Sequence, residues 1–475
     1  MWSIYESIIL VCKLNLIIIY IVFIIVAISN TSYCIADEYN TKEDKSKLDN
    51  SMFERGFGID KFVFSGFSPK TSDNMKGPKG GWIKNLSKDR FTFAGPWYGS
   101  KKIKAGEKKW YMDIVLDCIK SDIKMIFPLV PHRTITDTKD KKYHGAPGTS
   151  ISIANLNSYG DDEVADADDK QIDAWINDVE EQIKDVVVDE KINSVVAIWY
   201  IMPEEMRYWK KRELELLRRM CETVKKIDPK RRPAMMYEPQ HSSKERLKWT
   251  IPYQDILTIG IYPHYSGNDW NRVQVRHAMA QILKTIEDTN STALPAPTLE
   301  MFEDNDHPYA NSAIPWISRF VRHDVYCAFA NGAKGILVWS MGRRTGFKNY
   351  SKFYGAWADV SKELYELGLR DVFINGAPTN SAKITVTSGE EYVRFKWNKK
   401  IETYPTVSVR DWLYKDKVYI LIVNSSDKPV GFTLDGVPEG EYRALFVGDT
   451  VVVNSLEAII LPPLGTMMLT QYASS

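Results

Sequence analysis

The sequence predicts an α/β protein in which a (β/α)8 TIM barrel is followed by a C-terminal all-β sandwich domain. From about residue 57 to residue 368, short apolar runs alternate with longer amphipathic helical periods. This alternation is typical of a parallel sheet covered by helices. After about residue 375 the helical periods stop and period-two alternation begins. We therefore place the barrel at residues 55–374 and the sandwich at 375–475.

Eight apolar runs are the predicted strands of the barrel. Eight strand–helix repeats spread over about 310 residues fit a (β/α)8 barrel. The alternative is a doubly wound open sheet, and the lack of a glycine-rich phosphate-binding loop after the early strands argues against it. The runs are residues 62–64, 91–93, 125–127, 195–199, 234–237, 256–261, 297–299 and 335–339.

Helices and the C-terminal strands follow from the same periodicities. Apolar residues keep to one helical face over 172–187, 216–227 and 275–286. In the C-terminal part, residues 417–423 are a strong strand, and the polar turn after them leads into a return strand. Strands joined by such turns predict an antiparallel sandwich.

The N-terminus carries an apolar run from Leu14 to Ile28, with Lys13 before it and small residues at Cys34 and Ala36. This pattern predicts a signal peptide at residues 1–36 and a flexible, charged leader at 37–54. We therefore expect a secreted or periplasmic protein of the cell envelope. The apolar run is about 15 residues, whereas a membrane span needs about 20. An uncleaved membrane anchor is the alternative, and we expect membrane contact only in that case.

Composition argues against several classes of ligand. The formal net charge is +1 and no basic stretch is interleaved with aromatic residues, so we do not expect nucleic acid as a partner. The acids within residues 161–169 could suggest a Ca²⁺ loop, but their spacing matches no ligand pattern, and acids before a helix also favour its positive end. We predict no metal and no cofactor. Cys118, Cys221 and Cys327 occupy apolar helical positions and are expected to be buried thiols.

Carboxylates stand where two of the predicted strands end. Glu300 ends the seventh strand, and Glu204 and Glu205 follow the fourth. The carboxyl ends of barrel strands meet at one mouth, where active sites lie. Two carboxyl groups are what hydrolysis of a glycosidic bond requires, about 5–5.5 Å apart in a retaining enzyme. We predict Glu300 as the nucleophile and Glu204 as the acid/base, with Glu205 as its substitute.

These carboxylates also have a structural alternative. Glu204 and Glu205 precede a helix, and acids in a first helical turn favour its positive end. Glu300 is harder to explain in this way, because an acid that follows an apolar strand is costly to bury without a partner. We expect a raised pKa to keep Glu204 protonated while Glu300 stays ionised.

The order of a strand-four acid, a strand-seven nucleophile and a strand-eight tryptophan resembles the clan A retaining glycoside hydrolases, as a divergent subgroup. The residues that carry the resemblance are 199–205, 298–300 and 338–340. It implies cleavage of O-glycosidic bonds of a poly- or oligosaccharide by retaining double displacement. It further implies that Tyr262 orients the nucleophile and that Trp339 stacks under the sugar.

Pro203 is a departure from the clan, whose members usually place Asn before the acid/base Glu. This departure keeps open a non-catalytic carbohydrate-binding barrel protein of the cell envelope. An envelope protein with a purely structural role is a further alternative.

Other side chains are expected to line the cleft because they follow predicted strands. Each also has a structural reading, as a packed ring or as a core or loop histidine. Glu238 is in addition a rival acid, because its neighbours resemble an acid/base motif. The expected substrate-binding residues are Trp97, Tyr98, His132, Arg133, Tyr237, Glu238, Tyr262, His264 and Trp339.

Overall fold

The computed structural model describes most of the chain from residue 65 onward. The described residues are 65–67, 81–95, 105–134, 150–152, 164–202, 206–240, 243–339, 341, 346–397, 399–446, 450–453 and 458–471. All of them belong to one compact unit, Met52–Ser475. The predicted signal peptide and leader lie outside the described residues. Within the described part, none of the helices combines the length and the apolarity needed to cross a bilayer.

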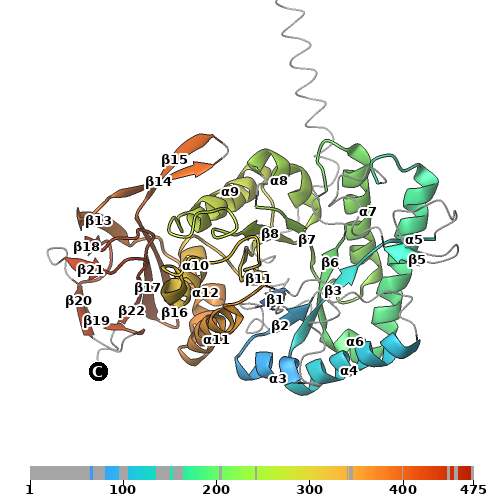
Figure 1. Cartoon of the computed structure of the whole chain (residues 1–475), viewed down its shortest axis with the longest axis horizontal. Helices are drawn as coiled ribbons and strands as arrows, with labels where there is room; N and C mark the ends of the chain where they lie inside the picture. Colours follow the sequence, from blue (N-terminus) through green and yellow to red (C-terminus); the bar gives the residue numbers. More distant parts are fainter. Residues whose placement is uncertain are drawn as a thin grey trace, which may run out of the picture. The chain divides into compact units, whose positions relative to one another are not determined.

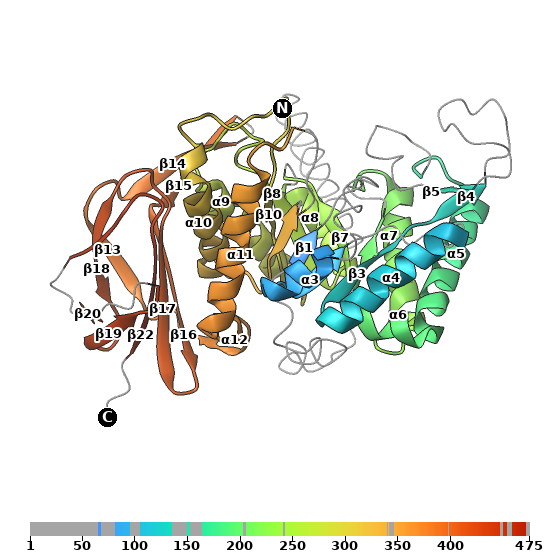
Figure 2. The same ribbon diagram turned by 60° about the horizontal axis from the view of Figure 1, so that its bottom comes forward.

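Eight parallel strands close into a barrel (Figures 1 and 2). The circle is complete because β11 pairs with β1, and β10 pairs with both β8 and β11. The predicted barrel is thus confirmed; its first predicted run, 62–64, lies outside the described residues and immediately precedes β1. The strands are β1 (Ser65–Phe67), β2 (Phe93–Gly95), β3 (Lys124–Leu129), β6 (Val196–Ile201), β7 (Ala234–Glu238), β8 (Ile256–Ile261), β10 (Thr298–Glu300) and β11 (Leu337–Trp339), with a short β9 (Leu294–Pro295) also along β8.

Amphipathic helices cover the outside of this barrel (Figure 2). They bury the apolar faces that the sequence predicts, for example Ile172, Val179 and Ile183 of one helix. The helices are α3 (Gly81–Lys88), α4 (Ala105–Ser121), α5 (Asp169–Val188), α6 (Glu190–Val195), α7 (Lys211–Ile227), α8 (Lys244–Thr250), α9 (Gln274–Thr289), α10 (Ile317–Ala330), α11 (Tyr350–Glu366) and α12 (Leu369–Asn375), with single 3₁₀ turns at Ile251–Tyr253 and Ile314–Trp316.

Two acids of the segment before α5 have structural roles. Asp168 caps this helix, because its side chain accepts from the backbone N–H of Gln171, whose own side chain bonds back. Asp169 forms an ion pair with Arg212 at 2.7 Å. Among the described residues there is no group of three or more side chains that could hold a metal ion.

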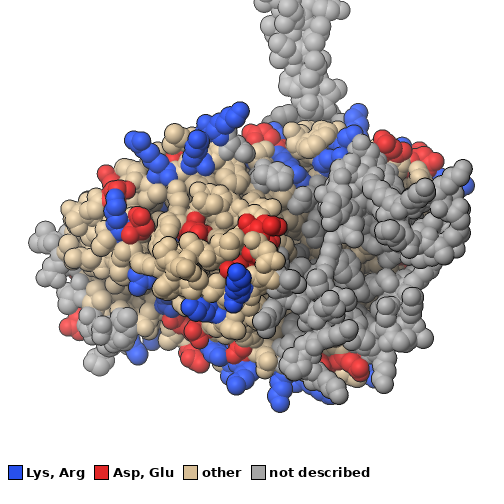
Figure 3. All heavy atoms as spheres, viewed as in Figure 1, with Lys and Arg blue, Asp and Glu red and all other residues tan. Residues whose placement is uncertain are grey.

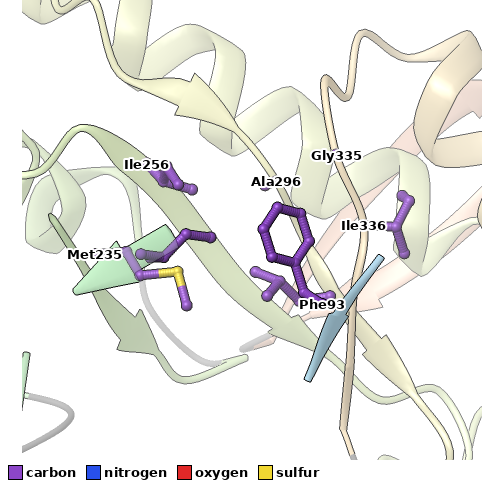
Figure 4. A pocket seen from close by; sticks show the side chains of 8 residues that line it. Phe93, Met235, Ile256, Ala296, Gly335 and Ile336 are labelled. Atoms are coloured by element: carbon purple, nitrogen blue, oxygen red, sulfur yellow. The ribbon is translucent and has the colours of Figure 1, made fainter. Parts of the chain in front are cut away.

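The floor of the barrel is an apolar cavity, shown in Figure 4. Its lining comes from the first halves of the strands, at the end opposite Glu300. This part of the barrel has an apolar lining and contributes packing. The three described cysteines, Cys118, Cys221 and Cys327, are buried free thiols. The lining residues are Phe93, Ile198, Met235, Ile256, Ala296, Gly335, Ile336 and Leu337.

The C-terminal part is a β-sandwich, as predicted. A six-stranded and a three-stranded antiparallel sheet enclose a second apolar core that includes Ile420, Phe432 and Leu469. The sheets are built from β12 (Ala377–Pro378), β16 (Val407–Tyr414), β17 (Lys417–Asn424), β22 (Thr466–Gln471), β19 (Gly440–Ala444) and β20 (Thr450–Val453), and from β13 (Lys383–Ser388), β18 (Val430–Asp435) and β21 (Ile459–Leu461). A separate hairpin, β14 (Tyr392–Trp397) and β15 (Lys400–Pro405), lies next to α9 (Figure 1).

Helices α9, α10 and α12 contact the sandwich, and α9 and α10 contribute polar contacts. On α9, Arg276 donates to the carbonyl of Pro405 at 2.9 Å and to the hydroxyl of Ser408 at 3.0 Å. On α10, the ring of His323 bonds the hydroxyl of Ser425 at 3.0 Å. Trp412 and Leu421 of the sandwich belong to the same apolar core cluster as the barrel, so the two parts form one compact unit.

Candidate active site

Glu300 ends β10 at the carboxyl end of the barrel and is 3% exposed. Its carboxylate is held by two main-chain amides. The N–H of His264 donates to Oε2 at 2.8 Å, and the N–H of Tyr265 donates to Oε1 at 3.0 Å. Each oxygen thus faces one donor, an arrangement that suits an ionised carboxylate in a defined orientation.

The turn after β8 aims these two amides. It is closed by main-chain bonds from Ser266 to the carbonyl of Tyr262 at 3.0 Å and from Asn268 to that of Pro263 at 2.8 Å. Gly267 adopts a φ of 70°, a left-handed conformation that glycine tolerates without strain. With its carbonyls used inside the turn, the amides of residues 264 and 265 are left to point at the neighbouring strand.

Burial sets the acidity of Glu300. The loss of solvent raises its pKa from 4.5 to about 7, although the charges of Arg272 and His264 and the two amides act in the opposite direction. Arg272 is itself buried and forms a bidentate ion pair with Asp324 on α10. From the sequence we expect Glu300 to stay ionised. Burial acts against this, because it raises the pKa of the carboxyl and so favours its protonated form.

His264 does not offer its ring to the cleft. Its Nδ1 lies 2.6 Å from Oδ1 of Asp269, and its Nε2 lies 2.9 Å from the carbonyl oxygen of His307. The residue is 7% exposed, and its ring stacks on Tyr309, with centroids 3.5 Å apart and planes 16° apart. The residue was predicted to bind substrate, but its hydrogen-bonding capacity is used inside the protein.

Aromatic rings form a cluster next to Glu300. Trp339 is the register partner of Glu300 on β11 and is half-buried. Its ring stacks on Phe302 at 5.0 Å and lies 5.0 Å from the ring of Tyr262. Tyr265 is 45% exposed and packs edge-on against Phe302 at 5.6 Å. The structure thus brings the predicted Trp339 and Tyr262 together with Glu300, and their contact with a sugar stays a prediction.

Tyr237 and Glu238 point to opposite faces of β7. Met235 lines the cavity inside the barrel, so alternation along the strand places Tyr237 inside and Glu238 outside. Tyr237 reaches over Gly260 of β8, because an added Cβ there would meet its hydroxyl at 2.2 Å.

Glu238 accordingly faces α8 and not the mouth. It is fully buried, and it accepts hydrogen bonds from Thr250 at 2.6 Å and from Arg246 at 3.1 Å. As a correction to the predicted cleft, this carboxylate joins a strand to its covering helix and has no surface to offer a sugar.

The structure adds buried ionic residues that the sequence pattern did not single out. Glu303 is 1% exposed and accepts from the backbone N–H of Tyr309 at 3.2 Å and of Asn349 at 2.8 Å. It holds the loop after β10 against the start of α11. A second acid after the apolar run of β10 was the signal available for Glu303, whereas Arg272 lies just before α9, where no periodicity marks it.

Several predicted residues cannot be placed. Glu204, Glu205, Trp97 and Tyr98 lie outside the described residues, so their roles stay predictions. His132 and Arg133 are described in their backbone only, within β4 (His132–Thr134), which pairs with β5 (Ser150–Ser152).

A buried ion pair follows the segment that contains the two fourth-strand acids. Glu213 of α7 is 0% exposed and accepts from the guanidinium Nε of Arg207 at 2.8 Å and from its backbone N–H. It ties the described start of this loop, residue 206 onward, to the helix.

The surface of the described part shows no single-sign field on the face in Figure 3, where acidic and basic side chains are interspersed. This pattern agrees with the near-zero net charge.

Comparisons with known proteins bear on the fold. No protein-family model and no curated protein matches the sequence. Among solved structures, a catalytic mutant of Gan42B, a GH42 β-galactosidase from G. stearothermophilus, is similar with a TM-score of 0.54 at 7% identity, over 86% of this chain and 98% of that one. An Anoxybacillus α-amylase gives a TM-score of 0.50 at 10% identity, over 87% and 98%. The chain therefore has the fold of known barrel glycoside hydrolases, as the resemblance predicted.

Proposed function

We propose that this chain is a retaining glycoside hydrolase that cleaves O-glycosidic bonds of a poly- or oligosaccharide. Glu300 is the nucleophile and Glu204 the acid/base, with Glu205 as the substitute for Glu204. The observation that carries the proposal is the carboxylate of Glu300, buried at the carboxyl end of a barrel strand and oriented by two main-chain amides. A fold shared with solved glycoside hydrolases supports the reaction class.

In the first step a carboxylate oxygen of Glu300 attacks the anomeric carbon. The bond from that carbon to the leaving oxygen breaks as Glu204 donates its proton to this oxygen. In the second step Glu204 takes a proton from water, whose oxygen attacks the anomeric carbon and releases Glu300. Two inversions retain the anomeric configuration.

Trp339 and Tyr262 are the proposed sugar contacts. Both rings lie beside Glu300 on neighbouring strands, and the face of a pyranose stacks well on an aromatic ring. Trp339 is partly exposed, so its ring is the one proposed to stack under the sugar. Tyr262 is buried and is proposed to orient the carboxylate of Glu300. Trp97, Tyr98, His132 and Arg133 complete the proposed cleft from earlier strands.

The proposed place of action is outside the cytoplasm. It depends on the sequence pattern of residues 1–36, which we propose to be a cleaved signal peptide. N-terminal sequencing of the exported protein tests this, and a mature chain that still begins before residue 36 contradicts cleavage at Ala36.

The experiment that tests the chemistry uses Glu300→Ala, Glu204→Ala and Glu205→Ala on a panel of aryl glycosides, with added azide. We expect the Glu300 variant to lose at least about 10³-fold in turnover, because a covalent step is removed. Azide then fills the space left by the carboxylate and gives a glycosyl azide of inverted configuration. The acid/base variant instead gives an azide of retained configuration, which tells Glu204 from Glu205.

Glu215→Ala is a matched control, because this partly exposed acid of α7 pairs with the partly exposed Arg212 and Arg219. Near-wild-type turnover of Glu300→Ala would overturn the assignment. Glycan affinity without product release from the parent chain would favour the non-catalytic carbohydrate-binding alternative that Pro203 suggests.

A further inference from the structure

We propose that His264 is a positioning residue, held as an imidazolium cation, which fixes the two main-chain amides on Glu300 and supports the ionised form of that carboxylate. The catalytic part of this proposal rests on the proposed function of Glu300. The charge state of the ring does not rest on it and can be measured separately.

The hydrogen-bond partners of the ring demand two protons. Oδ1 of Asp269 lies 2.6 Å from Nδ1, and the carbonyl oxygen of His307 lies 2.9 Å from Nε2. An ionised carboxylate and a main-chain carbonyl only accept hydrogen bonds. A neutral imidazole carries one N–H and would lose one of the two bonds inside a nearly closed site. The cation makes both.

The ring joins two loops that meet at Glu300. His264 belongs to the turn after β8, while His307 and Tyr309 belong to the loop after β10. Tyr309 stacks on the imidazole at 3.5 Å, and its backbone N–H donates to Glu303. The side-chain contacts of His264 thus fix the position of its own backbone. They thereby also fix the N–H that donates to Glu300.

Two acids act on the charge of the ring. Asp269 bonds Nδ1, and the charge of Glu300 also acts on the imidazole. Burial acts to lower the pKa of His264, but the hydrogen bonds to Asp269 and the carbonyl of His307 and the charge of Glu300 outweigh it, so the pKa is raised. Among the described residues, Tyr309 is the other titratable side chain in contact with the ring, and burial raises its pKa well above 10, so it stays neutral. Arg272, whose charge also acts on Glu300, is neutralised by Asp324.

Two further buried histidines provide an internal contrast. His277 is as buried as His264 at 7%, and desolvation lowers its pKa. His323 is fully buried and desolvation lowers its pKa as well. The structure therefore assigns the cation to His264 and neutral rings to His277 and His323 near pH 7.

The first experiment is ¹⁵N NMR of the full chain labelled in its histidine rings, assigned with His264→Gln and His277→Gln. We expect two protonated ring nitrogens at His264 from pH 5 to pH 7, and a neutral tautomer at His277 at pH 7. A neutral tautomer at His264 at pH 7 would overturn the proposal. This result is independent of whether the chain has hydrolase activity.

The second experiment follows the ¹³C signal of the Glu300 carboxyl through a pH titration. Removing a nearby positive charge disfavours the ionised carboxylate, so we expect its apparent pKa to rise by about 1–2 pH units in His264→Gln. Asp269→Asn is a second variant in case the first does not fold, and we expect a shift in the same direction. His277→Gln is the control, with no shift expected.

If the chain is an active hydrolase, the acid limb of its kcat/KM profile should move by the same amount in His264→Gln. An unmoved Glu300 titration in both variants would contradict the positioning role. If the apparent pKa of Glu300 shifts but the parent chain hydrolyses nothing, the positioning role of His264 is supported and only the proposed function is rejected.

Discussion

The main-chain N–H of Tyr265 lies 3.0 Å from Oε1 of Glu300, and this contact joins a turn after β8 to the last residue of β10. Because the donor belongs to the main chain, it lacks the rotational freedom that a side-chain donor has. Together with the amide of His264 it leaves the carboxylate one orientation. A pre-set carboxylate of this kind lowers the reorganisation that a reaction at its oxygen requires.

The pH dependence of the proposed reaction should reflect the buried state of Glu300. A nucleophile must be ionised, and burial raises the pKa of Glu300 to about 7. We expect kcat/KM, which reports the free enzyme, to fall about tenfold per pH unit below pH 7. Steady-state kinetics on an aryl glycoside between pH 4 and 9 measures this. An acid limb near the ordinary value of 4.5 would show that the carboxylate is more solvated than in this structure.

The same group links stability to pH. Its pKa is higher in the folded chain than the ordinary 4.5, so the folded state binds the proton more tightly. The stabilisation is complete below pH 4.5 and is lost as the pH rises through 7. Relative to Glu300→Gln, the wild type should lose about 2–3 kcal/mol of unfolding free energy between pH 5 and pH 8.

Urea denaturation of both proteins at several pH values tests this, because titrations that do not depend on the charge of Glu300 cancel in the difference. The absolute stability of Glu300→Gln is not informative, since its amide group places a donor opposite a main-chain N–H. A difference in unfolding free energy that stays constant with pH would contradict the raised pKa.

The buried ion pair of Glu213 should contribute to stability. Glu213→Ala removes the carboxylate that accepts from the guanidinium and the backbone N–H of Arg207, and we expect a loss of about 2–4 kcal/mol in unfolding free energy. Glu215→Ala on the same helix breaks partly exposed pairs and should cost less than about 1 kcal/mol. Equal losses in the two variants, measured by urea denaturation, would show that the buried pair is not special.

Gly260 is required by the rings above it. An alanine Cβ would meet the hydroxyl of Tyr237 at 2.2 Å and the ring of Tyr262 at 2.8 Å. We expect Gly260→Ala to cost about 1–3 kcal/mol of stability through overpacking and to lower kcat/KM by displacing Tyr262. Gly355→Ala is the control, because nothing lies within 4 Å of its Cβ inside α11, and it should stabilise by up to about 1 kcal/mol. Unchanged stability of Gly260→Ala by thermal unfolding would contradict this.

The barrel could be predicted because its signals are local. Each strand is a short apolar run, and Glu300 stands where one of these runs ends. The face of Glu238 could not be predicted with the same ease. A shift of one residue exchanges the inside and the outside of a strand, and only its contacts with Arg246 and Thr250 settle the question.

The role of His264 could not be predicted from the sequence either. Its partner Asp269 is near in the chain, but the carbonyl of His307 is more than forty residues away, as is Tyr309 of the same loop. Such contacts depend on how two loops meet, and hydrophobic periodicity carries no information about this. The same holds for Glu303, whose amide partner Asn349 lies beyond a whole helix.

The polar contacts from α10 into the sandwich have a consequence for the history of this chain. Arg272, whose charge acts on Glu300, pairs with Asp324; Asp324 bonds the ring of His323, and that ring bonds Ser425 in the C-terminal domain. A protein with its C-terminal domain deleted or replaced would leave this series of buried, hydrogen-bonded side chains exposed to solvent. Neither domain can therefore be replaced by an unrelated one without loss of these contacts. We expect the two domains to have been inherited together and to have diverged together.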